Sequence, residues 1–243
     1  MPTTGTIIAG LVYRDGALIG ADSQASDPML GAVGATPRGV RWETSKLKRV
    51  GNHPLVTGFS GNTGTSERLF RVLEAATIHA NQFNKRLTIQ NQLDRIYRPE
   101  YEGAAARSMP PPGIAPIAIH GLAAIWAEDQ AGLLEHEMNA DSGWHDHFQA
   151  IGSGKMTAFA VYRALGGQEL CRLSEGKAIT ALVRIIQTAI SVEMAFVGEP
   201  LQVWRINAAG AAELSQVELD AHKEAVAKWQ RQEQDNLFKG EEP

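Results

Sequence analysis

Cysteine is almost absent from this chain, and other features that would define a class of function are missing too. Cys171 is the only cysteine among 243 residues, so a disulfide within the chain is impossible and a reducing compartment is permitted. No apolar run approaches the length of a membrane span, and residues 1–5 lack the regions of a signal peptide. These absences predict a cytoplasmic protein with no membrane contact.

The chain also lacks a marked excess of one charge. The formal net charge is -4 and no basic stripe is present, so we expect no nucleic-acid partner. His145, Asp146 and His147 could ligate a metal together with Glu135 and Glu137, but their spacing matches no known metal site. We therefore expect polar loop residues here, with no metal and no cofactor. With 44% hydrophobic and 21% charged residues, the chain can bury one large core.

What the chain does contain is a threonine at the start of an apolar strand. Gly5 and Thr6 open the apolar run 7–13, which turns back to end at Asp22. A threonine hydroxyl needs a base, and the α-amino group of Thr6, with a reference pKa of about 7.7–8.0, could serve once residues 1–5 are removed. Gly5 suits such a cut, because its carbonyl can be approached closely. The alternative is a first strand that simply begins with threonine.

Further along the chain lie two charged residues that are candidates for the same site, and a loop of small residues. Asp22 follows Thr6 by sixteen positions, and Lys46 begins the alternating segment 46–50, which indicates another strand. The small-residue segment 57–64 then runs into a helical pattern. Glycines between a strand and a helix can bring backbone N–H groups close to a reacting carbonyl, as an oxyanion hole requires.

This order of elements resembles the proteasome β-subunit family, including the HslV-type peptidase rings of bacteria. In that family a Gly-Thr bond is cut autocatalytically, and an aspartate follows the threonine by sixteen positions, as Asp22 follows Thr6 here. The family's lysine ahead of a Gly-rich loop is matched by Lys46 and Gly61, and its Gly-Ser-Gly turn is matched around Ser153. The resemblance spans residues 5 to 207, which is most of the chain.

The resemblance implies a mechanism for these residues. Thr6 Oγ would attack a peptide carbonyl and pass its proton to its own amine, and the Gly61 N–H would stabilise the oxyanion. Lys46 would lie near Oγ as a fixed positive charge, held in place by the Asp22 carboxylate. Ser153 would support the threonine amine, although a Gly-Ser-Gly turn ahead of a helix can also be a plain N-cap.

The resemblance also implies roles for residues that would contact the substrate. Ser26 and Thr63 match positions whose backbones pair with an extended peptide. Phe59 matches the floor of the pocket for the residue before the cut, where a phenyl ring would make the pocket shallow; the alternative is an ordinary core residue. Where proteasomes carry Asp-x-x-Ser-Gly-Gly, this chain has Glu193 in place of the aspartate and Phe196 in place of the serine. HslV-type peptidases also lack that pattern.

The same resemblance implies an α+β fold, a four-layer αββα sandwich of the N-terminal-nucleophile hydrolase type. We expect a propeptide over 1–5, a peptidase domain over 6–215, and a C-terminal helix and tail over 216–243. Hydrophobic patterning predicts alternating blocks of sheet and helix. The predicted segments are helices at 64–82, 84–97, 155–166, 175–194 and 216–238, strands at 114–127, 131–139, 200–206 and 211–215, and a loop at 103–116.

Function and partners follow from the same likeness. Family members assemble into stacked rings of six or seven subunits, some of them fed by a separate ATP-dependent unfoldase. The resemblance implies a homo-oligomeric threonine endopeptidase that hydrolyses unfolded polypeptides. One alternative is a catalytically idle or unprocessed scaffold subunit, and another is a non-proteolytic amidohydrolase of the wider class. Idle subunits carry a long N-terminal extension, whereas the leader here has five residues, which favours the peptidase.

Overall fold

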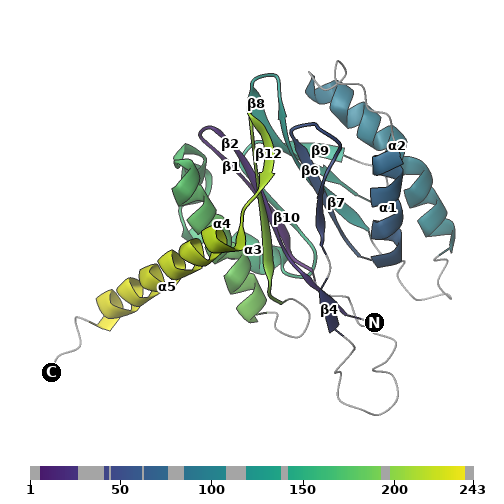
Figure 1. Ribbon diagram of the computed structural model, residues 1–243. Helices are drawn as coiled ribbons and strands as arrows, with labels where there is room; N and C mark the ends of the chain where they lie inside the picture. The colour runs from purple at the N-terminus through teal and green to yellow at the C-terminus, as the bar shows by residue number, and fades with distance from the viewer. Residues whose placement is uncertain are drawn as a thin grey trace, which may run out of the picture.

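Two stacked β-sheets form the centre of the molecule, and helices cover their outer faces, as the computed structural model in Figure 1 shows. The fold is therefore an αββα sandwich of the α+β class, as predicted. The structure describes residues 6–26, 41–43, 45–61, 63–75, 85–107, 119–137, 142–192 and 198–238.

The first sheet has five antiparallel strands in the order β10-β1-β2-β11-β12. Its strands are β1 (Ile8–Tyr13), β2 (Gly16–Asp22), β10 (Phe148–Ile151), β11 (Leu201–Asn207) and β12 (Gly210–Glu213). The hairpin of β1 and β2 is buried almost throughout, because helices cover one face and the second sheet covers the other. A strand buried on both faces is apolar in a continuous run, as residues 7–13 are.

The second sheet is also antiparallel, in the order β5-β6-β7-β8-β9. Its strands are β5 (Leu47–Arg49), β6 (Leu55–Ser60), β7 (His120–Ala127), β8 (Gln130–His136) and β9 (Ser142–His145). The three-residue strand β5 lies at one edge, next to β6 only. A separate pair joins β3 (Gln24–Ser26) to β4 (Arg41–Glu43).

Four helices form the two outer layers. They are α1 (Thr63–Ala75) and α2 (Arg86–Arg107) on the second sheet, and α3 (Lys155–Ala164) and α4 (Glu175–Val192) on the first. A short 3-10 helix, Gly167–Arg172, joins α3 to α4. The helix α5 (Gln216–Phe238) contacts α4 and then extends away from the sandwich (Figure 1). In the described ranges, every helix is too short or too polar to span a bilayer.

The structure corrects the sequence prediction at several elements. Residues 103–107 are helical rather than part of a loop, because α2 continues to Arg107. Tyr97 and Tyr101 anchor this helix in the core one turn apart, and the three alanines at 104–106 favour its continuation. Strands β9 and β10 were not predicted, because each has only four residues, which is too short for a clear hydrophobic pattern. Part of the predicted helix over 64–82 and part of the predicted loop lie outside the described residues.

Candidate active site

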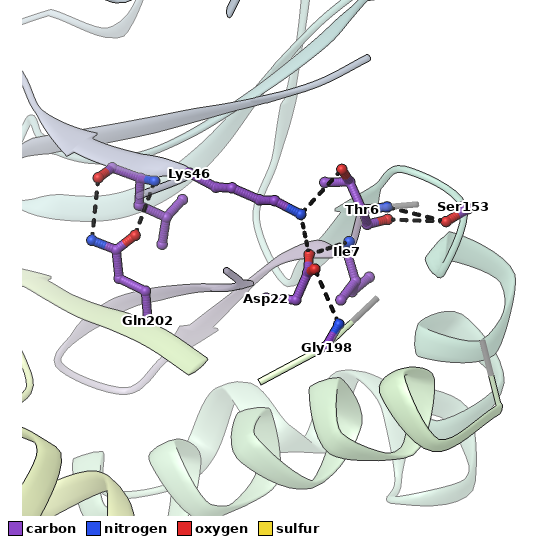
Figure 2. Close-up of polar contacts among 8 residues, drawn as sticks. Thr6, Ile7, Asp22, Lys46, Ser153, Gly198 and Gln202 are labelled. Carbon is purple, nitrogen blue, oxygen red and sulfur yellow. Dashed lines mark hydrogen bonds and ion pairs between the residues drawn. The ribbon is translucent and has the colours of Figure 1, made fainter. Parts of the chain in front are cut away.

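Thr6, Asp22, Lys46 and Ser153 come together at one end of the first sheet (Figure 2). Thr6 directly precedes β1, Asp22 ends β2, and Ser153 lies in the turn between β10 and α3. Strand β1 pairs with β2 on one side and with β10 on the other, so the ends of all three strands meet at Thr6. Lys46 reaches the same point from the second sheet, where it directly precedes β5.

A buried ion pair lies beside the threonine hydroxyl. Lys46 Nζ is 2.8 Å from Asp22 Oδ1 and 3.3 Å from Thr6 Oγ1. The Asp22 carboxylate also accepts the Ile7 N–H on Oδ1 at 2.9 Å and the Gly198 N–H on Oδ2 at 3.3 Å. Asp22 is fully buried and Lys46 is 8% exposed. Both carboxylate oxygens therefore have donors, and Oδ1 holds the ammonium group beside the hydroxyl.

Burial perturbs both members of this pair. It lowers the pKa of Lys46 and raises the pKa of Asp22 from their ordinary values, while their mutual attraction opposes both shifts. A protonated Lys46 beside Thr6 Oγ favours negative charge on that oxygen. Because both charges are enclosed, removing either one would leave the other uncompensated.

Ser153 contacts the backbone of Thr6 on both sides of the residue. The Thr6 N–H donates to Ser153 Oγ at 3.2 Å, and the Ser153 hydroxyl donates to the Thr6 carbonyl oxygen at 3.4 Å. The N-cap of α3 is Gly154, with no side-chain cap, so Ser153 is not a plain N-cap. In the intact chain this nitrogen belongs to the Gly5-Thr6 peptide bond; after a cut there, it would be the free amine.

Gly152 makes this contact possible, and the sequence alone assigned it no role. Its φ is +93°, and a Cβ at this position would lie 2.1 Å from the Thr6 carbonyl oxygen. Residues with a side chain rarely adopt such a backbone angle. Only glycine therefore allows the 152–154 turn to lie directly against Thr6.

Gly152→Ala is expected to lower the free energy of unfolding by about 2–4 kcal/mol, because strain and a backbone clash act together. Gly167→Ala is the matched control, since Gly167 also has a positive φ of +59° but nothing within 4 Å of its added Cβ. We expect that control to cost about 1 kcal/mol. Urea unfolding at equal protein concentrations measures both, and equal losses would contradict the close-approach argument.

The remaining predicted residues are only partly described. Gly61 follows β6 with a φ of +121°, and Thr63 opens α1 two residues later. Ser26 is the last residue of β3. Gly5 and Glu193 lie outside the described residues.

Phe59 lies in the core between the second sheet and its helices. It is 4% exposed, and its ring makes edge contacts with Phe70 at 5.1 Å and Tyr97 at 5.3 Å between centroids. Its strand neighbour Gly58 faces Ile8 between the two sheets. The Phe59 side chain therefore points away from the inter-sheet core, towards α1 and α2.

The polar cluster around His145 is an ion-pair network across the strands. His145 ends β9 rather than lying in a loop, and its Nε2 is 3.2 Å from Glu135 Oε2. Burial raises the pKa of Glu135, but His145 and Lys155 together lower it to about 2. Within the described ranges, no group of three or more His, Cys, Asp or Glu side chains could hold a metal ion.

An αββα sandwich with a threonine at the head of a central strand defines the class of N-terminal-nucleophile hydrolases. The sequence model described as Proteasome subunit matches residues 3–206. The chain belongs to the proteasome subunit family. This membership implies a hydrolase subunit of a compartmentalised protease and a ring-forming oligomer. A comparison with curated proteins gives no match.

Proposed function

We propose that this protein is a threonine endopeptidase subunit, activated by autocatalytic cleavage between Gly5 and Thr6. The observation that carries the proposal is the 3.3 Å approach of Lys46 Nζ to Thr6 Oγ1, with Asp22 holding the lysine. A buried cation beside a hydroxyl stabilises the developing alkoxide. The 3.2 Å contact of Ser153 with the Thr6 nitrogen supports a role in orienting the freed amine.

The proposed cycle forms and breaks one ester. Thr6 Oγ attacks the substrate carbonyl carbon, and the neutral Thr6 amine accepts the hydroxyl proton. The C–N bond of the substrate then breaks, and its leaving nitrogen takes that proton from the Thr6 ammonium. Water, deprotonated by the same amine, hydrolyses the acyl ester and restores Oγ. In both halves the Gly61 N–H would donate to the oxyanion.

Substrate binding and assembly form the second part of the proposal. The backbones of Ser26 and Thr63 would pair with an extended peptide, whereas the buried ring of Phe59, in contact with Phe70 and Tyr97, favours the alternative of an ordinary core residue. Glu193 would take the place of the family aspartate near the amine. Subunits would form two stacked homo-oligomeric rings of six or seven in the cytoplasm, with an ATP-dependent unfoldase delivering polypeptides.

Intact mass spectrometry of the purified protein tests the activation step. The wild type is expected to lose residues 1–5, whereas Thr6→Ala should keep them, because no hydroxyl remains to attack the Gly5 carbonyl. Thr6→Ser is the matched control and should still be cut. An uncut wild type without peptidase activity would contradict the proposal and favour an unprocessed scaffold subunit of the same fold.

A further inference from the structure

Gln202 binds the main chain directly beside Lys46, far from it in sequence (Figure 2). Gln202 Oε1 accepts the Leu47 N–H at 3.1 Å, and Gln202 Nε2 donates to the Leu47 carbonyl oxygen at 3.3 Å. Ser45 Oγ donates to the same carbonyl at 2.9 Å and accepts from Gln202 Nε2 at 3.1 Å. One carboxamide thus engages both backbone groups of a single residue.

This contact provides hydrogen bonds on the outer side of an edge strand. Leu47 begins β5, a three-residue strand at the edge of the second sheet. An edge strand presents unpaired N–H and C=O groups on its outer side and is prone to fraying. The Gln202 side chain occupies that outer side at Leu47, so the segment leading from Lys46 is bonded on both edges.

The backbone of Gln202 is fixed next to Asp22. In the pairing of β11 with β2, Leu201 lies opposite Asp22 and Gln202 lies opposite Ala21. One strand pair therefore carries both groups: a carboxylate that binds the tip of Lys46, and a carboxamide that binds the main chain of the next residue, Leu47. The distance between those two anchors is set by rigid sheet geometry.

We propose that Gln202 is a positioning residue for Lys46, because it fixes the backbone of the next residue, Leu47, relative to the strand pair that carries Asp22. The inference rests on the proposed function, in which Lys46 Nζ must stay within reach of Thr6 Oγ. Without Gln202, the main chain beside Lys46 would be held by its pairing with β6 and by Ser45 only, and its outer side would lose both bonds to the carboxamide. A displacement of about 1 Å at a catalytic group can cost up to about 100-fold in rate.

Gln202→Met tests this proposal, because methionine has similar length but cannot form the two bonds. Peptide hydrolysis by the assembled protein is expected to show a kcat lowered by about 10- to 100-fold, with KM within about twofold of the wild type. Gln216→Met is the matched control. Gln216 is exposed at the start of α5, where its amide contacts Asp220, and its loss should leave both constants unchanged.

A second readout does not depend on activity. Acetylation of Lys46 with acetic anhydride across pH, quantified by peptide mass spectrometry, reports the pKa of its amine. In Gln202→Met we expect that pKa to rise towards the ordinary lysine value, since the amine is no longer held in its buried position. Gln202→Glu keeps an acceptor for the Leu47 N–H but loses the donor, so its effects should lie in between.

Two results would overturn the positioning role. One is a kcat and a Lys46 titration in Gln202→Met that both match the wild type. The other is a lowered activity with an unchanged Lys46 titration, which would indicate a general structural defect. If the wild type itself hydrolyses no peptide, the proposed function fails, while the titration of Lys46 still decides the role of Gln202.

Discussion

Thr6→Ala, in a chain that already begins at residue 6, is expected to lower the rate of peptide hydrolysis by about 10³-fold or more. The hydroxyl is the group that attacks the substrate carbonyl in the proposed cycle, and Lys46 lies 3.3 Å from it. Removing the leader beforehand, with a tag that a separate protease cuts, gives every variant a free amine at residue 6. The experiment therefore measures catalysis without the contribution of processing.

Thr6→Ser, prepared in the same way, is the matched control. It keeps the hydroxyl and the amine and loses one methyl group, so we expect its activity within about tenfold of the wild type. Initial rates on a fluorogenic peptide, together with the mass of a trapped acyl-enzyme, measure the difference. Full activity of the alanine variant would exclude Thr6 as the nucleophile.

Lys46→Met is expected to reduce kcat by about 10²- to 10³-fold and to lower the free energy of unfolding by about 3–5 kcal/mol. The kinetic effect follows from losing the positive charge beside Thr6 Oγ. The stability effect has a different origin, because Asp22 is fully buried and would lose its counter-charge. Kinetics under saturating peptide and urea unfolding measure the two effects separately.

The double variant Asp22→Asn with Lys46→Met distinguishes these two causes. It removes both buried charges, so much of the lost stability should return. Activity should stay low, since no cation remains at the hydroxyl. Recovery of activity in the double variant would show that Lys46 acts only by stabilising the fold.

The order of chemical groups along this chain could be predicted from the sequence because each is marked by a local pattern. A hydroxyl heads an apolar run at Thr6, an acid ends the returning strand at Asp22, and Lys46 opens an alternating segment. Local patterns of this kind survive folding, because they reflect burial and strand pairing within a short stretch. The resemblance built on them predicted the family and the sandwich, and both predictions are confirmed.

The contacts that complete the site were not predictable in this way. Gly152 lies against Thr6, and Gln202 binds Leu47 across 155 positions of sequence. A glycine or a glutamine has no pattern that names its partner. The short strands β9 and β10 were not predictable either. Only residues 146 and 147 separate them, yet they belong to different sheets.

By itself, the sequence therefore determined where a hydroxyl, two opposite charges and a turn lie along the chain, together with the layers that bury the apolar runs. Only the tertiary structure decided how close Lys46 comes to Thr6 and what keeps it there. The physical reason is that reach and orientation depend on how two sheets pack against each other. That packing depends on contacts between residues distant in the chain, such as the bonds of the Gln202 carboxamide to the Leu47 main chain, which exist only after both sheets have formed.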